Sequence, residues 1–403
     1  MWRLPRPWAP HSGLRFAAVT AMTRIAFFGH NASDTAVGRR VQAFRDDGVE
    51  VVGFMMRRGP DAPRGWENID LGATADAAYL QRIRAILCGA RIAARAREKL
   101  AAADVIVARN LDMLATAFLA RRLAGLATPV IYECLDVHRV LTRNDPVGFI
   151  LRRIEGFLLA RCRGLIVSSP GFLKNYFEIR HRGRYTASVI ENRLASGSDY
   201  GPRPDKSAAP RSAETPLRVG WVGVLRCARS LDLLINLARE LGPRVRVEMH
   251  GRPALTEVPD FHEKIAGLAN MSYHGPYQSP ADLAGIYAGI DLLWAGDFME
   301  AGYNSVWLLP NRLYEGGYYA VPPIAPADTQ TAAWIADKGV GFSAPEDLAV
   351  TLPRLTQHLV DDRTPILERR ARLLALPTAT FVQQLGAHRA VIEAALTPRG
   401  ARR

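Results

Sequence analysis

The chain has 403 residues, of which 48% are hydrophobic and 23% charged, the balance of a soluble globular protein. This length favours two domains over one. A net charge of +13 favours an anionic partner, although charge alone does not choose among nucleic acid, a phosphate-bearing substrate and an acidic membrane.

The first 22 residues carry arginines and prolines around a short apolar run. A secretory signal needs a longer apolar core and a small-residue cleavage site, so we expect a disordered extension, with Met22 as an alternative first residue to Met1. The four cysteines form no paired motif, and no apolar run is long enough to span a membrane. We therefore expect a protein of the reducing cytoplasm.

Strand-like and helix-like segments alternate through residues 23–195, which predicts a Rossmann-like domain with a parallel sheet. Apolar runs of strand length end at glycines or polar residues, and helical spacing of apolar residues separates them. The strands are predicted at residues 24–29, 49–54, 104–108, 129–133, 165–168 and 189–192. Helices are predicted after the first strand and at residues 81–100, 113–124 and 149–162.

Residues 196–216 are rich in Ser, Gly, Pro and Ala and predict a linker. A second alternating series over residues 217–377 predicts another Rossmann-like domain, and residues 378–403 a helix that returns to the first domain and a basic tail. The fold class is therefore α/β, with two doubly wound domains facing across a cleft. Its strands are predicted at residues 217–223, 245–250, 271–274, 291–294, 322–325 and 341–343, and its helices at 230–241, 280–288, 311–320, 345–359 and 378–396.

The most specific segment is Pro310-Asn-Arg-Leu-Tyr-Glu-Gly-Gly-Tyr-Tyr-Ala-Val-Pro-Pro323. It predicts a helix with Glu315 in its early turns, broken by glycines and followed by a strand. A carboxylate at that place can accept hydrogen bonds from both hydroxyls of a ribose, and glycine backbone N–H groups can approach phosphate. The alternative is that Glu315 only stabilises the start of a surface helix.

This segment resembles the nucleotide-binding segment of the GT-B glycosyltransferases, especially the retaining family 4. Further segments resemble the same family in the same order, at residues 34–44, 104–110, 130–138, 190–192, 219–223, 274–275 and 283–291. The resemblance implies transfer of a hexosyl or glycuronosyl group from a nucleotide-diphosphate donor to a glycan or lipid-linked acceptor, in surface polysaccharide or glycolipid synthesis. It implies no metal and no cofactor besides the donor substrate.

The resemblance also assigns donor-binding residues, with departures from the family pattern. The family's second carboxylate, eight residues before Glu315, is Trp307 here, so Asn304, Glu300 and Ser305 become candidates for the transferred sugar. The arginine often found after the second domain's first glycine is Val224. The remaining candidates for the nucleotide and its diphosphate are Gly223, Arg226, Arg229, Asn311 and, from the first domain, Gly29.

Candidate acid/base groups follow the strand predicted at residues 129–133. Asp136 and, second to it, His138 lie on a loop at a carboxyl strand end, where a side chain can reach the cleft and deprotonate an acceptor hydroxyl. Glu133 belongs to the same neighbourhood. The alternative is that these are loop residues with structural partners.

Residues 81–100 combine a row of apolar residues with arginines and a lysine, which predicts a basic amphipathic helix. One hypothesis is docking onto an anionic membrane at the inner face of the cell membrane, and the alternative is a core-packed helix with a solvated face. A nucleotide-sugar epimerase and a non-catalytic glycosyltransferase-like subunit remain alternatives for the whole chain. Nucleic-acid binding is disfavoured, because the basic residues are not interleaved with aromatic residues on one face.

Overall fold

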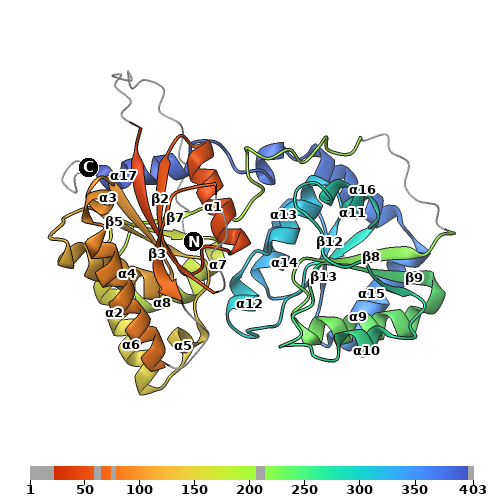
Figure 1. Ribbon diagram of the computed structural model, residues 1–403. Coiled ribbons are helices and arrows are strands. Elements are labelled where there is room, and N and C mark those ends of the chain that lie inside the picture. The colour runs from red at the N-terminus through yellow and green to blue at the C-terminus, as the bar shows by residue number, and fades with distance from the viewer. Residues whose placement is uncertain (1–21, 59–64, 74–78, 206–213, 398–403) are drawn as a thin grey trace, which may run out of the picture.

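The computed structural model describes residues 22–58, 65–73, 79–205 and 214–397. Most of the predicted N-terminal extension, part of the predicted linker and the basic tail lie outside these residues. The described chain forms two α/β domains side by side (Figure 1).

The first domain is built on a parallel seven-stranded sheet with the order β3-β2-β1-β4-β5-β6-β7. Its central strands β1, β4 and β5 are buried along nearly their whole length, as expected for a parallel sheet covered on both faces. The strands are β1 (Arg24–Gly29), β2 (Glu50–Arg57), β3 (Asn68–Ala73), β4 (Val105–Arg109), β5 (Val130–Cys134), β6 (Gly164–Val167) and β7 (Ala187–Val189).

Helices cover both faces of this sheet. One face packs against α1 and the C-terminal helix α17, and the other against α2, α4 and α6. The helices of the first domain are α1 (Thr35–Asp46), α2 (Tyr79–Arg95), α3 (Arg97–Ala101), α4 (Asn110–Leu123), α5 (Arg139–Thr142), α6 (Pro146–Leu159), α7 (Pro170–Phe172), the π-helical turn η1 (Leu173–Phe177) and α8 (Glu178–Arg180).

The second domain has a parallel six-stranded sheet with the order β10-β9-β8-β11-β12-β13. Its strands are β8 (Leu217–Val222), β9 (Val245–His250), β10 (Met271–Tyr273), β11 (Leu292–Trp294), β12 (Pro323–Pro326) and β13 (Phe342–Ala344). Its helices are α9 (Ala228–Leu241), η2 (Gly242–Arg244), α10 (Phe261–Ile265), α11 (Leu283–Ala288), α12 (Asn304–Trp307), α13 (Asn311–Tyr318), α14 (Gln330–Lys338), α15 (Leu348–Asp361) and α16 (Thr364–Ala375). The two sheets confirm the predicted class of two doubly wound α/β domains.

The last segment of the chain crosses back to the first domain. A continuous helix was expected over residues 378–396, but the chain forms a short turn, η3 (Thr378–Thr380), an extended crossing and then α17 (Ala387–Leu396). The crossing is extended because its backbone pairs with Leu194, which donates to Phe381 O and accepts from Gln383 N. Gly386, with φ of 86°, begins α17, and the Asp47 carboxylate accepts from the amides of Gly386 and His388.

Several further elements differ from the expectation. The edge strand β3, the helices α14 and α16 and several short helices were not predicted, and β7 ends at Val189, where a strand was expected to begin. The helix expected over residues 81–100 is divided into α2 and α3 at Ala96. No helix in the described part of the chain is long and apolar enough to cross a membrane.

Candidate functional site

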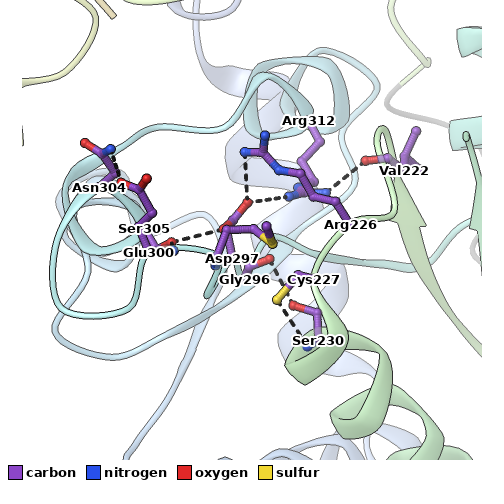
Figure 2. Close-up of polar contacts among 11 residues, drawn as sticks. Val222, Arg226, Cys227, Ser230, Gly296, Asp297, Glu300, Asn304, Ser305 and Arg312 are labelled. Atoms are coloured by element: carbon purple, nitrogen blue, oxygen red, sulfur yellow. Dashed lines mark hydrogen bonds and ion pairs between the residues drawn. The ribbon is translucent and has the colours of Figure 1, made fainter. Parts of the chain in front are cut away.

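A cationic cluster lies at the carboxyl edge of the second sheet. Arg226 follows β8, Asp297 follows β11, and Arg312 lies in the first turn of α13 (Figure 2). The Asp297 carboxylate lies 3.7 Å from a guanidinium nitrogen of Arg226 and 3.9 Å from one of Arg312. Arg312 also donates to Val222 O at 3.1 Å, while the Arg226 side chain stays half exposed. One carboxylate therefore positions two arginines beside the end of β8.

Gly223 gives this cluster its close backbone packing. Its φ is 119°, and a Cβ atom built on the neighbouring Gly251 would lie 1.6 Å from Gly223 O. Side chains larger than hydrogen are thus excluded where the loops after β8 and β9 meet. The structure places Gly223 next to the arginine cluster, the neighbourhood that the sequence predicted for it.

Glu315 lies on α13 and is 5% exposed. Tyr287 donates to one carboxylate oxygen at 3.0 Å, and Arg39 of the first domain lies 3.8 Å from the other. Burial raises the pKa of Glu315, and the charges of Arg39 and Arg312 oppose that rise. The predicted ribose carboxylate therefore faces the first domain and not bulk water.

The other predicted nucleotide-binding residues differ in placement. Arg229 is exposed and its guanidinium stacks 4.4 Å from the ring centroid of Phe298, in the loop that carries Asp297. Asn311 lines a small cavity of about 40 Å³ between the domains, together with Arg39 and His388. Gly29 is buried, and an added Cβ would meet Met55, so its neighbourhood is a packed core.

Asn304, a candidate for the transferred sugar, is used to join the domains. It is 6% exposed, accepts from Val137 N at 2.9 Å and donates to Val137 O at 2.7 Å. Its amide also donates to Glu300. With both ends of the amide engaged, Asn304 is not free to bind a sugar in this structure, and Glu300 is the better-placed candidate.

Asp136 lies on the loop after β5, across from the arginine cluster. Part of its side chain reaches solvent, while residues of both domains surround the rest. Desolvation by the surrounding protein raises the pKa of Asp136, and Asp297 adds to the rise, whereas Arg226 and His30 oppose it. The predicted base therefore shares an electrostatic neighbourhood with the predicted phosphate ligand Arg226.

His138 is placed less favourably for base chemistry. Its Nδ1 accepts a hydrogen bond from Val140 N at 3.3 Å and so caps α5. Its Nε2 lies 3.5 Å from a guanidinium nitrogen of Arg82 on α2. These contacts favour the alternative that the sequence left open, in which His138 is a loop residue with structural partners.

Glu133 is also structural. It is fully buried, 2.7 Å from Arg40 Nε and 2.8 Å from Arg109 Nε. Burial alone would raise the pKa of Glu133, but the two guanidinium groups hold it below its usual value. Arg40 in turn contacts His388 of α17. The carboxylate is thus a buried ion-pair centre of the first domain.

Comparison with known proteins agrees with this architecture. The succinoglycan biosynthesis protein ExoL of Rhizobium meliloti is 37% identical over 359 residues, which cover 86% of this chain and 88% of ExoL. The chain belongs to the ExoL family. No protein-family model matches it.

Solved structures similar to this chain are GT-B glycosyltransferases. HepE of Anabaena in complex with UDP aligns with a TM-score of 0.65 and 15% identity, covering 92% of this chain and 99% of HepE. A glycosyltransferase of Rickettsia africae aligns with a TM-score of 0.66 and 15% identity, covering 94% and 100%. The chain therefore has the GT-B fold.

The packing of Trp307 explains why this chain lacks the second carboxylate of the family 4 pattern at that position. It is 9% exposed, its ring packs edge-on against Phe172 of the first domain, and its carbonyl accepts from the Ser169 hydroxyl. A Cβ on Gly171 would lie 2.5 Å from that carbonyl oxygen. The residue at the position of the expected carboxylate is an interdomain packing residue.

Three residues of this site were missed from sequence: Arg39, Asp297 and Arg312. Arg312 stands next to Asn311 in the diagnostic segment, and Arg39 lies in the helix quoted for the resemblance, so both had a signal. Asp297 follows a predicted strand but belongs to no motif. Among the described residues, no group of three or more His, Cys, Asp or Glu side chains is placed to hold a metal ion.

Proposed function

We propose that this ExoL relative transfers a sugar from a nucleotide-diphosphate donor to a glycan or lipid-linked acceptor during synthesis of a surface polysaccharide. The observation that supports it most is the Glu315 carboxylate, buried beside Tyr287 and Arg39 and one helix turn from Arg312. The carboxylate would accept hydrogen bonds from the two ribose hydroxyls, which would take over the contact that Arg39 now makes.

Arg226, Arg312 and Arg229 would hold the diphosphate. Guanidinium groups bind phosphate oxygens in a bidentate manner and stabilise the negative charge that develops on the leaving diphosphate. Asp297 would keep Arg226 and Arg312 in place between turnovers, since it already lies between them. A uridine nucleotide is the first candidate donor, because HepE is described in complex with UDP and with UDP-glucose.

Asp136 would act on the acceptor, as a base for the attacking hydroxyl or as a charge that stabilises an oxocarbenium-like state. Its electrostatic contact with Arg226 supports a position between acceptor and diphosphate. Glu300 lies close enough to Asp136 for the charge of Asp136 to add to the rise that burial causes in the pKa of Glu300, and it would accept hydrogen bonds from sugar hydroxyls. A lipid-linked acceptor would also suit docking onto the inner face of the cell membrane, one of the two hypotheses raised for the helix over residues 81–100.

The test is thermal stabilisation by UDP, GDP, ADP and their sugars, with the wild type, Glu315→Gln and the control Glu248→Gln. Glu248 is also a buried carboxylate of the second domain, on β9, where it contacts His274. We expect one nucleotide class to raise the melting temperature of the wild type and the control, but not of Glu315→Gln. The proposal is refuted if no nucleotide stabilises the wild type or if Glu315→Gln keeps the full response in direct calorimetric titration.

A further inference from the structure

Helix α6 exposes four large apolar side chains and buries a carboxylate. Its solvent side carries Phe149, Ile150, Ile154 and Phe157, which are 58%, 56%, 42% and 56% exposed. Three of these, at positions 150, 154 and 157, follow the spacing of one helix face. A surface helix of a monomeric globular protein normally has the opposite arrangement, so this face is suited to an apolar surrounding.

The buried side of α6 explains how the helix keeps this orientation. It carries Leu158 and Leu159, which pack in the core, together with Gly148, Gly156 and Glu155. The Glu155 carboxylate accepts from the hydroxyls of Tyr132 and Tyr176 and contacts His181 Nε2 at 2.9 Å. Rotating α6 to bury the phenylalanines would expose the Glu155 carboxylate or leave its partners without their hydrogen bonds. The apolar side of α6 therefore stays in contact with solvent.

The exposed face of α6 forms one wall of a groove, and α4 forms the other. The groove has a volume of about 1210 Å³ and includes Phe118 and Leu119 of α4. Arginines also line it: Arg121, Arg122, Arg153, Arg161 and Arg184. Four of the five are exposed, and none forms an ion pair with a carboxylate of the described residues.

Aliphatic and aromatic side chains with arginines at their margin have the chemistry of an interfacial membrane surface. Apolar side chains enter the acyl boundary, while guanidinium groups extend to the phosphates. Arg161 already lies over the Phe157 ring, at 3.5 Å from its centroid, with one N–H donated to Phe157 O. A second copy of this chain is disfavoured as the occupant, since a two-fold contact would bring the arginines of both grooves together.

The position of the groove relative to the candidate site agrees with such a surface. Helix α5 follows His138 directly and packs against α6, to which Arg152 ties it by donating to Leu141 O at 2.8 Å. In Figure 1, α5 lies on the side of α6 that is nearer to the second domain. A membrane on α4 and α6 would thus lie next to the loop that carries Asp136.

We infer that the α4–α6 groove is the surface by which this protein docks onto an anionic phospholipid bilayer. The helix α2, for which docking and core packing were alternatives from sequence, buries Ala90 and Ala93 in the core, although Ile83 and Leu87 remain exposed on it. Docking at the groove does not depend on the proposed transfer reaction, because it needs neither donor nor acceptor.

Co-sedimentation with vesicles of phosphatidylcholine alone or with phosphatidylglycerol, in the absence of nucleotide, tests the inference. We expect binding to the anionic vesicles only, weakening as salt is added. Two variants remove the surface: Ile150→Ser/Phe157→Ser and Arg122→Glu/Arg153→Glu. Because all four side chains are exposed, both variants should melt at nearly the wild-type temperature and bind at least about tenfold more weakly.

The matched controls carry the same changes on other surfaces. They are Leu255→Ser/Leu385→Ser, at positions 50% and 68% exposed, and Arg239→Glu/Arg354→Glu on α9 and α15. Both should bind like the wild type. The inference is overturned if the wild type ignores anionic vesicles, if control and groove variants lose binding equally, or if ultracentrifugation shows a dimer that the Ile150→Ser/Phe157→Ser variant dissociates. None of these outcomes bears on nucleotide binding, which the Glu315 test measures separately.

Discussion

The ion-pair centre at Glu133 allows the sharpest prediction for stability. In Glu133→Gln the side chain keeps its shape but loses its charge, leaving the side chains of Arg40 and Arg109, 5% and 1% exposed, without a counter-charge. Removing one partner of a buried ion pair costs about 3–5 kcal/mol. For a domain of this size, that corresponds to a fall of about 6–20 °C in melting temperature. Differential scanning calorimetry measures it directly.

The control is Asp232→Asn, which removes an exposed pair with Lys264 of similar length, 2.8 Å. It should cost less than about 1 kcal/mol. Because the folded pKa of Glu133 lies below its unfolded value, its contribution is complete at neutral pH and is lost as the pH falls through the folded pKa. The wild type and Glu133→Gln should therefore converge only in acid. If Glu133→Gln melts within a degree or two of the wild type at neutral pH, Glu133 is not an ion-pair centre.

Three further outcomes are expected. Asp136→Asn should lower kcat by about 10²–10⁴ with unchanged donor affinity. It should also abolish the acidic limb of the pH–rate profile, which in the wild type lies above the usual aspartate range because the pKa of Asp136 is raised. Full activity of the variant in steady-state kinetics would exclude Asp136 as the base. Asn304→Ala should cost about 1–3 kcal/mol and accelerate amide hydrogen exchange at Val137, and unchanged exchange there would contradict the interdomain bond. Asp34→Asn keeps a side-chain oxygen that can cap α1 but removes the negative charge, so it should destabilise the protein at neutral pH. The difference from wild type should vanish as acid unfolding curves approach pH 2, because burial is outweighed by the bonds from His30 and Ala36 that hold the pKa of Asp34 at about 2. A difference that already vanishes near pH 4 would refute that pKa.

The sequence predicted the two sheets because parallel strands are short apolar runs with regular connections, and this signal is local. It also predicted the neighbourhood of Gly223, Arg226 and Glu315, since residues after adjacent parallel strands meet at one sheet edge. Whether a side chain there is free depends on the other domain. Asn304 hydrogen-bonds to Val137, and Trp307 packs against Phe172. Both partners lie more than a hundred residues earlier in the chain, and no local sequence pattern carries that information.

Helix α6 shows a second limit of sequence reasoning. Its apolar residues predict a helix over residues 149–162, and such a pattern is normally taken to mark the core-facing side. Its core side instead carries Glu155 together with Leu158 and Leu159, and the partners of Glu155, which are Tyr132, Tyr176 and His181, come from β5 and from the segment after β6. A buried network assembled from distant residues therefore contributes to which side of the helix meets the solvent.

The segment from Asp297 to Trp307 has a mechanical consequence. It belongs to the second domain by sequence, yet Asn304 and Trp307 bind it to the first. One end therefore moves with Val137, the neighbour of Asp136, and the other end moves with the arginines that Asp297 holds. Any rotation between the domains must pull on this short stretch. If an incoming acceptor displaced the Asp136 loop, this segment would transmit the displacement to Arg226 and Arg312 through only a few residues of chain.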